Sequence, residues 1–379
     1  MKKSIAFIIN RKASGLRKKE NWEKAWVFLE KNFGKLTNTT YYLEEGMEKN
    51  IIRLNNTKYY KDIKDIDFKS HRNFIILGGD GTIQVALQGF KKLESLEEKI
   101  LGIIPSGAGD DISNELNMPN KEIAANCINN ALNGNNNYIK RADIGKATLF
   151  KDNIKKELYF LGAAGIGIDG DIIKKLEHEL EPVKNIVSYF KGENNKFMQN
   201  IGKIIYNLST LYSLVTYKPK NYLVKINNKT TTYEKVFSVN VSNIKTTGGG
   251  IKVCPNAEID DGYLDVCIIN NIPRLYGISL LLKANNGQHI GKRGVEYYNK
   301  KDRIKRVSVE SLDNQLFDLH LSGEYENARK AVFEIIPKAL NIIYNPHPNN
   351  NWQYQQIERF INFKVVTLIM TEISYNLYW

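Results

Sequence analysis

The chain has 379 residues, of which 42% are hydrophobic and 25% charged, and its formal net charge is +13. This composition is typical of a folded globular protein and excludes a disordered chain, and the length favours two domains. We expect no signal peptide and no membrane-spanning helix, because the apolar stretch at residues 4–9 has only strand length and no window approaches about 18 apolar residues. The scattered Cys127, Cys254 and Cys267 suit neither a disulfide framework nor a metal site, which favours a reducing cytoplasm.

The positive charge predicts a polyanionic partner such as a nucleotide, nucleic acid or an anionic bilayer. Lysine-rich runs lie at residues 10–20, 218–225 and 299–307. None of them contains a base-stacking motif or a recognition helix, so we expect no specific nucleic-acid partner. An anionic membrane surface suits the same charge, at about 1 kcal/mol per basic residue. A solvated surface rich in lysine and asparagine is the alternative that the composition leaves open.

Strands and helices alternate in the first part of the chain. Apolar runs and helical spacing predict, in order, a strand at 4–10, a helix at 20–33, a strand at 39–43, a helix at 47–54, a strand at 73–77, a helix at 83–90 and a strand at 99–107. This alternation indicates a mostly parallel sheet with helices on both faces.

From about residue 143 the chain becomes rich in short strands whose alternating pattern indicates an antiparallel sandwich or barrel. The predicted β-rich segments are 157–168, 221–227, 236–243, 262–270, 303–311, 316–323 and 331–337. A helical stretch at about 171–215 interrupts them. We therefore predict an N-terminal three-layer α/β nucleotide-binding domain over residues 1–143, an antiparallel β-sandwich domain over 144–345, and a linker with a short apolar tail over 346–379.

A Gly-Gly-Asp-Gly-Thr string occupies residues 78–82, between a predicted strand and a predicted helix. Its glycines let the backbone approach an anion at the carboxyl edge of the sheet, with the next helix N-terminus facing it. Thr82 is expected to cap that helix. A carboxylate among phosphates needs an intervening cation, so Asp80 predicts Mg²⁺. A tight strand–helix turn is the alternative, and it accounts poorly for the whole string.

A second glycine turn, "PSGAGDD" at residues 105–111, follows the next strand, and the two turns are expected to form one phosphate site. The Walker pattern is absent. The glycines of residues 162–170 have the wrong spacing for a dinucleotide fingerprint.

Further strings narrow the class: "IINRKASG", "IIPSGAGDD", "FLGAAGIGIDGDI", "GGGIKVCPNAEIDDGYLDVCII" and "LSGEY". In this order they resemble the diacylglycerol kinase catalytic-domain family of lipid kinases, which includes bacterial diacylglycerol kinases and sphingosine kinases. The resemblance covers residues 3–345. It implies an ATP-binding α/β domain and a β-sandwich domain that takes the lipid, with the active site between them.

The resemblance also implies two cofactors, ATP and Mg²⁺. The implied cofactor-binding residues are Asn10, Thr40, Gly78, Gly79, Asp80, Gly81, Thr82, Ile83, Gln84, Ser106, Gly107 and Gly109. A structural Mg²⁺ near the sandwich would take the backbone oxygens of Glu258 and Tyr263 and the side chain of Asp261, and oxygen ligands suit this hard cation. An Asp-Gly turn before a strand is the alternative for that segment.

The catalytic base of the family belongs to an Asp-Gly-Glu turn, which here reads Ser322-Gly323-Glu324. A serine does not act as a base near neutral pH, so the resemblance leaves Glu324 for that role, while Asp111 would organise Mg·ATP together with Asp80.

Other family positions also differ in this chain. Ala108 stands for a threonine, Asp110 for an asparagine, Val85 for a glutamate and Tyr42 for a threonine, whereas Asp143 matches a family carboxylate. These changes touch the nucleotide or the chemistry rather than the core.

We expect a cytoplasmic, membrane-peripheral kinase that phosphorylates a lipid hydroxyl. The alternative is a catalytically impaired nucleotide- or lipid-binding protein on the same fold, and NAD kinase activity is a third hypothesis that the later motifs disfavour. The sequence does not identify the lipid, and it leaves a homodimer open. The histidines are scattered, so we expect surface or core positions for them rather than ligand roles.

Overall fold

The computed structural model describes residues 4–10, 16, 19–36, 39–44, 57–60, 65–91, 93, 96–107, 109–176, 212–213 and 216–348. Within these ranges, no helix combines the length and the apolarity that crossing a bilayer requires. The predicted helix at 47–54, residue Ala108, most of the predicted helical stretch after residue 176 and the tail after residue 348 lie outside the described residues.

The first part of the chain forms a parallel sheet in the order β3-β2-β1-β4-β5. Its strands are β1 (Ile5–Ile9), β2 (Thr39–Glu44), β3 (Thr57–Tyr60), β4 (Asn73–Gly78) and β5 (Ile100–Pro105). Strands β1 and β4 are buried along their whole length. Their continuous isoleucine-rich runs suit parallel strands that are covered on both faces.

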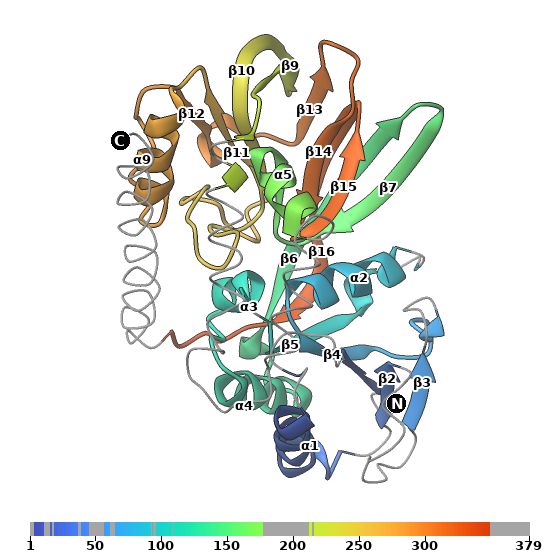
Figure 1. The fold of residues 1–379 in the computed structure, drawn as a ribbon. Helices are drawn as coiled ribbons and strands as arrows, with labels where there is room; N and C mark the ends of the chain where they lie inside the picture. The colour runs from blue at the N-terminus through green and yellow to red at the C-terminus, as the bar shows by residue number, and fades with distance from the viewer. Residues whose placement is uncertain are drawn as a thin grey trace.

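Helices cover both faces of this sheet (Figure 1). They are α1 (Lys19–Phe33), α2 (Asp80–Phe90), α3 (Asp111–Glu115) and α4 (Lys121–Leu132), with short 3₁₀ turns at Leu96–Glu98 and Asn136–Tyr138. Helices α1 and α4 lie together on one face and α2 lies on the other (Figure 1). Phe7, Leu29, Phe90 and Ile128 are buried in the core between these layers.

The second part is antiparallel. Its strands are β6 (Ile139–Lys151), β7 (Ile154–Phe160), β8 (Ala163–Gly167), β9 (Lys220–Ile226), β10 (Lys229–Ser242), β11 (Asp265–Asn270), β12 (Val295–Tyr298), β13 (Arg306–Ser311), β14 (Phe317–Leu321), β15 (Glu324–Ala328) and β16 (Lys330–Ile343). Its helices are α5 (Ile168–Lys174) and α9 (Arg274–Ala284), with a 3₁₀ turn at Lys300–Asp302. A second core gathers the inward-facing residues of these strands, such as Tyr222, Val239 and Phe333.

Strands β6 and β16 run from one part of the molecule into the other as an antiparallel pair (Figure 1). Ile144 of β6 lies in the first core, whereas Leu149 of the same strand lies in the second. At its far end β16 pairs in parallel with β5, through Asn341 and Ile342. The end of the sandwich segment thus completes the N-terminal sheet, and the sequence boundary near residue 143 falls within β6.

The predicted fold class is confirmed, with parallel strands first and antiparallel strands after them. The elements β3, α4, β6, α9, β12 and β15 have no counterpart among the predicted ones. In α4, alanines and asparagines dilute the apolar stripe, and in β15 one exposed and three half-buried residues precede the buried last one. The hydrophobic patterns of α4 and β15 are therefore weak.

Candidate functional site

The two glycine loops lie side by side where β4 and β5 end. The Ser106 amide donates a hydrogen bond to the Gly78 carbonyl at 3.0 Å. A Cβ at Gly79 would lie only 2.7 Å from the Cα of Gly107, so a larger residue at either position would push the loops apart. The loops therefore form one edge, as their sequence predicts.

Asp80 connects the first loop to α3. Its carboxylate accepts hydrogen bonds from the amides of Asp111 at 3.0 Å and Ile112 at 3.1 Å, and so caps the N-terminus of that helix. Burial, followed by the charges of Asp111 and Asp110, raises the pKa of Asp80 to about 8. The sequence gives no signal for the capping role, because the two segments are far apart along the chain.

The prediction that Thr82 caps α2 is wrong. Helix α2 begins at Asp80 with Gly79 as its N-cap, and no side chain caps it. Thr82 lies in the first turn instead, where its hydroxyl oxygen accepts a hydrogen bond from Asn10 Nδ2 at 3.1 Å. Thr82 also packs closely against Gly78, where a Cβ would lie 2.5 Å from the threonine hydroxyl oxygen. Two predicted site residues, Asn10 and Thr82, are thus in contact.

The second loop is closed by its own aspartate. The Asp110 carboxylate accepts the Gly107 amide, with distances of 2.9 and 3.1 Å to its two oxygens. Asp110 has a φ of +54°, in the left-handed region that aspartate tolerates better than most residues. One backbone amide of the proposed phosphate loop is therefore bound by an internal anion.

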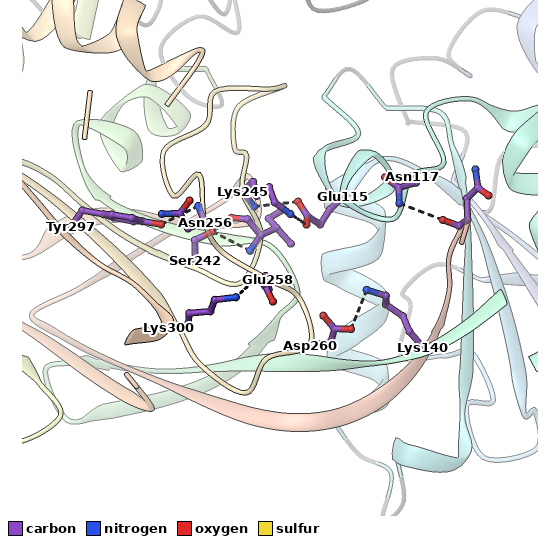
Figure 2. Close-up of polar contacts among 12 residues, drawn as sticks. Glu115, Asn117, Lys140, Ser242, Lys245, Asn256, Glu258, Asp260, Tyr297 and Lys300 are labelled. Carbon is purple, nitrogen blue, oxygen red and sulfur yellow. Dashed lines mark hydrogen bonds and ion pairs between the residues drawn. The ribbon is translucent and has the colours of Figure 1, made fainter. Parts of the chain in front are cut away.

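The sandwich reaches over α3 through the loop that follows β10. Asp111 Oδ2 accepts the Gly249 amide at 2.7 Å, and a Cβ at Gly109 would lie 3.3 Å from the Gly249 Cα. Lys245 binds Glu115 on the same helix, with 2.6 Å between Nζ and Oε1 (Figure 2). This loop thus fixes the carboxylates of α3 against the second part of the molecule.

Glu324 brings a carboxylate of the sandwich to the first glycine loop. A Cβ at Gly81 would collide with Glu324 Oε1. Glu324 follows a two-residue hairpin turn in which Ser322 and Gly323 have φ values of +49° and +89°. Positive φ at both positions is the geometry that Asp-Gly favours, so serine is an unusual first residue here. The Ser322 hydroxyl oxygen accepts the Gly162 amide at 3.2 Å.

Three predicted cofactor-binding residues occupy other environments. Ile83 is buried in the core and its amide donates to the Gly79 carbonyl at 3.2 Å. Gln84 is also buried, and its side chain donates to the Tyr159 carbonyl at 2.7 Å, which ties α2 to β7. Thr40 on β2 pairs with Ala6 on β1, and Ala6 pairs with Phe74 on β4. Thr40 is therefore displaced from Gly78 by two strands across the sheet and by four residues, roughly 13 Å, along the strand direction.

The remaining family differences have varied settings. The side chain of Val85 is exposed on α2, and Tyr42 lies on β2. Asp143 is fully buried on β6, where its carboxylate accepts the amides of Gly262 and Lys338, each at 2.6 Å.

The Gly262 turn lies between the predicted ligands of the structural metal. Asp261 Oδ1 accepts the Tyr263 amide at 2.9 Å, and its Oδ2 is buried with no hydrogen-bond partner in the described part of the chain. Burial, followed by the charges of Glu258 and Asp143, raises the pKa of Asp261. The Glu258 side chain binds Lys300, and Lys140 binds Asp260 nearby (Figure 2).

These residues fit a bound divalent cation, because an unpartnered buried carboxylate oxygen among other carboxylates gains from neutralisation. Among the described residues, no group of three or more His, Cys, Asp and Glu side chains is arranged to hold a metal. The predicted site relies on Asp261 alone for a side-chain ligand and otherwise on backbone oxygens.

Together, the fold and this junction define a two-part protein in which paired glycine loops of an α/β layer face a carboxylate carried by an antiparallel sandwich. A family model described as the diacylglycerol kinase catalytic domain matches residues 4–147, and one described as the YegS C-terminal NAD kinase beta sandwich-like domain matches residues 188–344. The chain therefore carries a diacylglycerol kinase catalytic domain followed by a YegS-type C-terminal domain, as its motifs predict.

Several known proteins are similar to this chain. The chain is 24% identical to a diacylglycerol kinase of Bacillus subtilis over 70% of this chain and 77% of that protein. A solved structure named a diacylglycerol kinase, from Bacillus anthracis, superposes with a TM-score of 0.55 at 19% identity, covering 91% of this chain and 97% of the other. Yeast NADH kinase has a TM-score of 0.53 at 9% identity, with 96% and 89% covered, which shows a shared fold.

Proposed function

We propose that this protein is an ATP-dependent lipid kinase that transfers the γ-phosphate of ATP to the hydroxyl of a diacylglycerol-like lipid and requires Mg²⁺. The observation that carries the proposal is the contact of Glu324 with Gly81. It brings a carboxylate from the sandwich to the glycine loop of the nucleotide-binding part. Named diacylglycerol kinases among the relatives support the same acceptor class.

The nucleotide would lie along the edge formed by the two glycine loops. The N-terminus of α2 supplies partial positive charge there, whereas the Gly107 amide is bound by the Asp110 carboxylate. Asp80, Asp110 and Asp111 supply carboxylates beside it, and their mutual repulsion is what raises the Asp80 pKa beyond the effect of burial. Mg²⁺ bound with ATP would neutralise these charges and those of the phosphates.

Glu324 is our candidate for the general base. The lipid hydroxyl oxygen attacks the γ-phosphorus, the bond to the bridging oxygen of ADP breaks, and the hydroxyl proton passes to the Glu324 carboxylate. Ser322 does not serve this role, because a serine hydroxyl is not a base near neutral pH. Positioning and charge neutralisation supply the rest of the rate enhancement.

The second metal site would be structural. A cation held by Asp261 Oδ2 and the backbone oxygens of Glu258 and Tyr263 would fix the loop that precedes β11. The same loop donates the Gly262 amide to buried Asp143. The segment would thereby hold the two parts of the molecule in register.

The net charge of +13 suits a protein that works peripherally on an anionic membrane of the cytoplasm. There it would meet a lipid whose hydroxyl lies at the headgroup level.

The test is transfer of labelled γ-phosphate from ATP to a lipid panel in anionic micelles, with NAD as a further acceptor. We expect Glu324→Gln to lower kcat by about 10²- to 10⁴-fold with little change in KM for ATP. Glu310→Gln, which removes an exposed carboxylate paired with Lys330, is the matched control and should retain the activity.

Labelled lipid in the parent protein and its loss in Glu324→Gln would support the proposal. Binding of ATP without any labelled lipid would instead favour the catalytically impaired alternative, and labelled NAD would favour an NAD kinase.

A further inference from the structure

His320 lies next to the turn that carries Glu324. It is buried on β14, with 4% of its surface exposed. The Gly323 amide donates a hydrogen bond to His320 Nδ1 at 3.3 Å. That nitrogen therefore acts as an acceptor, and the proton of the neutral ring is on Nε2. The histidine thus binds the backbone of the residue directly before Glu324.

The other edge of the ring faces Asp169 on α5. A Cβ at Gly165 would lie 2.5 Å from His320 Nε2 and 2.7 Å from Asp169 Cβ, so both side chains crowd the same glycine. The Asp169 carboxylate accepts hydrogen bonds from the Ser238 hydroxyl and from Asn240 Nδ2 at 3.2 Å. A buried polar cluster therefore extends from β10 through Asp169 to the imidazole.

The turn has further anchors besides His320, since Leu321 pairs with Glu324 across the hairpin and with Ala164 of β8. The Ser322 amide donates to the Ala163 carbonyl at 2.8 Å, and the Ser322 hydroxyl oxygen accepts the Gly162 amide. Gly323 itself has space around its α-carbon, since a Cβ there would meet nothing within 4 Å. The bond to His320 is accordingly what holds the Gly323 amide.

We propose that His320 is a positioning residue that holds the Gly323 turn, and with it Glu324, against the first glycine loop, and that protonation of its ring releases the turn and switches phosphoryl transfer off. The inference rests on the proposed function. A protonated imidazole carries N–H on both nitrogens, so Nδ1 no longer accepts the Gly323 amide and two donors face each other.

The charges around the ring affect the pH at which His320 becomes protonated. The titratable or charged side chains on β14 and on the elements packed against it are Asp318 on β14, Asp169, Asp171 and Lys174 on α5, and Glu324, Tyr325 and Glu326 on β15; strand β8 carries none.

Most of these groups have partners of their own. Lys174 and Tyr325 both bind Asp318, while Asp171 and Glu326 bind Lys175 and Lys156. Asp169 is the charge that acts on the ring, and it favours the protonated form. Burial has the larger effect and lowers the pKa of His320 below its ordinary value. The expected loss of activity therefore begins on the acid side of neutrality.

Two substitutions separate the positioning role from simple packing. In His320→Asn the amide oxygen replaces Nδ1 as an acceptor that does not titrate, whereas His320→Leu keeps the bulk and loses the acceptor. We expect His320→Leu to lower kcat by about 10- to 100-fold with KM for ATP within about twofold, since misplacement of a reacting group by about 1 Å has effects of this size. His320→Asn should keep kcat within about threefold at pH 7.5 and lose less activity than the parent protein at pH 5.5, because its amide oxygen still accepts the Gly323 amide hydrogen bond and does not titrate.

His71→Asn is the matched control. His71 is buried in the N-terminal part, and burial likewise lowers its pKa, but it lies far from the turn. This variant should lose kinase activity at acid pH to the same extent as the parent protein. Thermal unfolding of every variant checks that it is folded.

A second readout needs no kinase activity. In NMR spectra of the parent protein, the Gly323 amide shift should titrate with the same midpoint as the His320 ring. If the parent labels no lipid but this coupling is present, the proposed function fails and the positioning role stands. The inference would be overturned if the Gly323 amide shift did not follow the ring titration, or if His320→Leu kept the kcat of the parent. It would also be overturned if His320→Asn lost as much activity at acid pH as the parent protein.

Discussion

Asp110 places a negative charge in the loop that is proposed to face the phosphates of ATP. Its carboxylate is bound to the Gly107 amide, and it adds to the charges that act on Asp80. The family carries an asparagine at this position, which has a similar shape and no charge. The aspartate should therefore weaken nucleotide binding without disturbing the loop.

We predict that Asp110→Asn tightens the binding of Mg·ATP by about three- to tenfold. The substitution removes a negative charge that repels the phosphates, and such a change is worth about 1 kcal/mol in a partly solvated site. Calorimetric titration of ATP at fixed Mg²⁺ measures it. Asp65→Asn, an exposed change in the same part of the molecule, should leave the affinity unchanged. Equal or weaker binding by Asp110→Asn would show that the charge is not facing the nucleotide.

At the scale of elements, α3 depends on contacts from outside itself. It spans Asp111–Glu115, which is too short for a helix to be stable alone. Asp80 caps its start, and the sandwich loop binds it through Gly249 and Lys245. The position of the Asp111 carboxylate is therefore set jointly by both parts of the protein.

We predict that Lys245→Met lowers the free energy of unfolding by about 1 kcal/mol and raises KM for ATP, because Glu115 is largely buried and loses its charged partner. Urea unfolding and ATP kinetics measure the two effects. The control is Lys330→Met, which breaks an ion pair between more exposed side chains and should cost less than about 0.5 kcal/mol. An unchanged KM in Lys245→Met would argue against a role for the sandwich loop in orienting α3.

At the scale of the whole molecule, the cluster of carboxylates at the junction couples stability to pH. The folded protein keeps the proton of Asp80 up to about pH 8, whereas the unfolded chain loses it near pH 4. Between these values the folded state binds more protons. The free energy of unfolding should therefore fall as the pH rises, by at most about 1.4 kcal/mol per pH unit from this group.

We predict that Asp80→Asn flattens the decline in stability between pH 5 and pH 8, and that Mg²⁺ with ATP stabilises the parent protein most near pH 8. Urea unfolding at a series of pH values measures both slopes. The pKa of Asp265 is raised to about 7 mainly by burial, so this residue also lowers the free energy of unfolding as the pH rises. It does so in both proteins, and the difference between their two slopes therefore reports the contribution of Asp80. A slope in Asp80→Asn equal to that of the parent would refute this account.

The local features of the fold follow from sequence. The buried runs that form β1, β4 and β5 and the apolar spacing of α1 and α2 are strong periodic signals, and all of these elements form within a few residues of their predicted bounds. The two glycine loops are equally local, since each lies directly after a strand of a parallel sheet. The pairing of β5 with the end of β16 does not follow from the sequence. The two segments are over 200 residues apart, and the hydrophobic pattern of a strand does not indicate which other strand it pairs with.

The sequence by itself determined the change from alternating strands and helices to antiparallel strands, the positions of the two glycine loops and the resemblance to lipid kinases. Only the tertiary structure decided which of the predicted site residues act together. In the folded protein Glu324 contacts Gly81, and Asp80 accepts a hydrogen bond from the first amide of α3. Gln84 donates a hydrogen bond to the Tyr159 carbonyl, and His320 accepts one from the turn that precedes the candidate base. Periodicity and glycine spacing report the conformation of neighbouring residues. The direction of a hydrogen bond between distant segments depends instead on how whole elements pack, which no local pattern records.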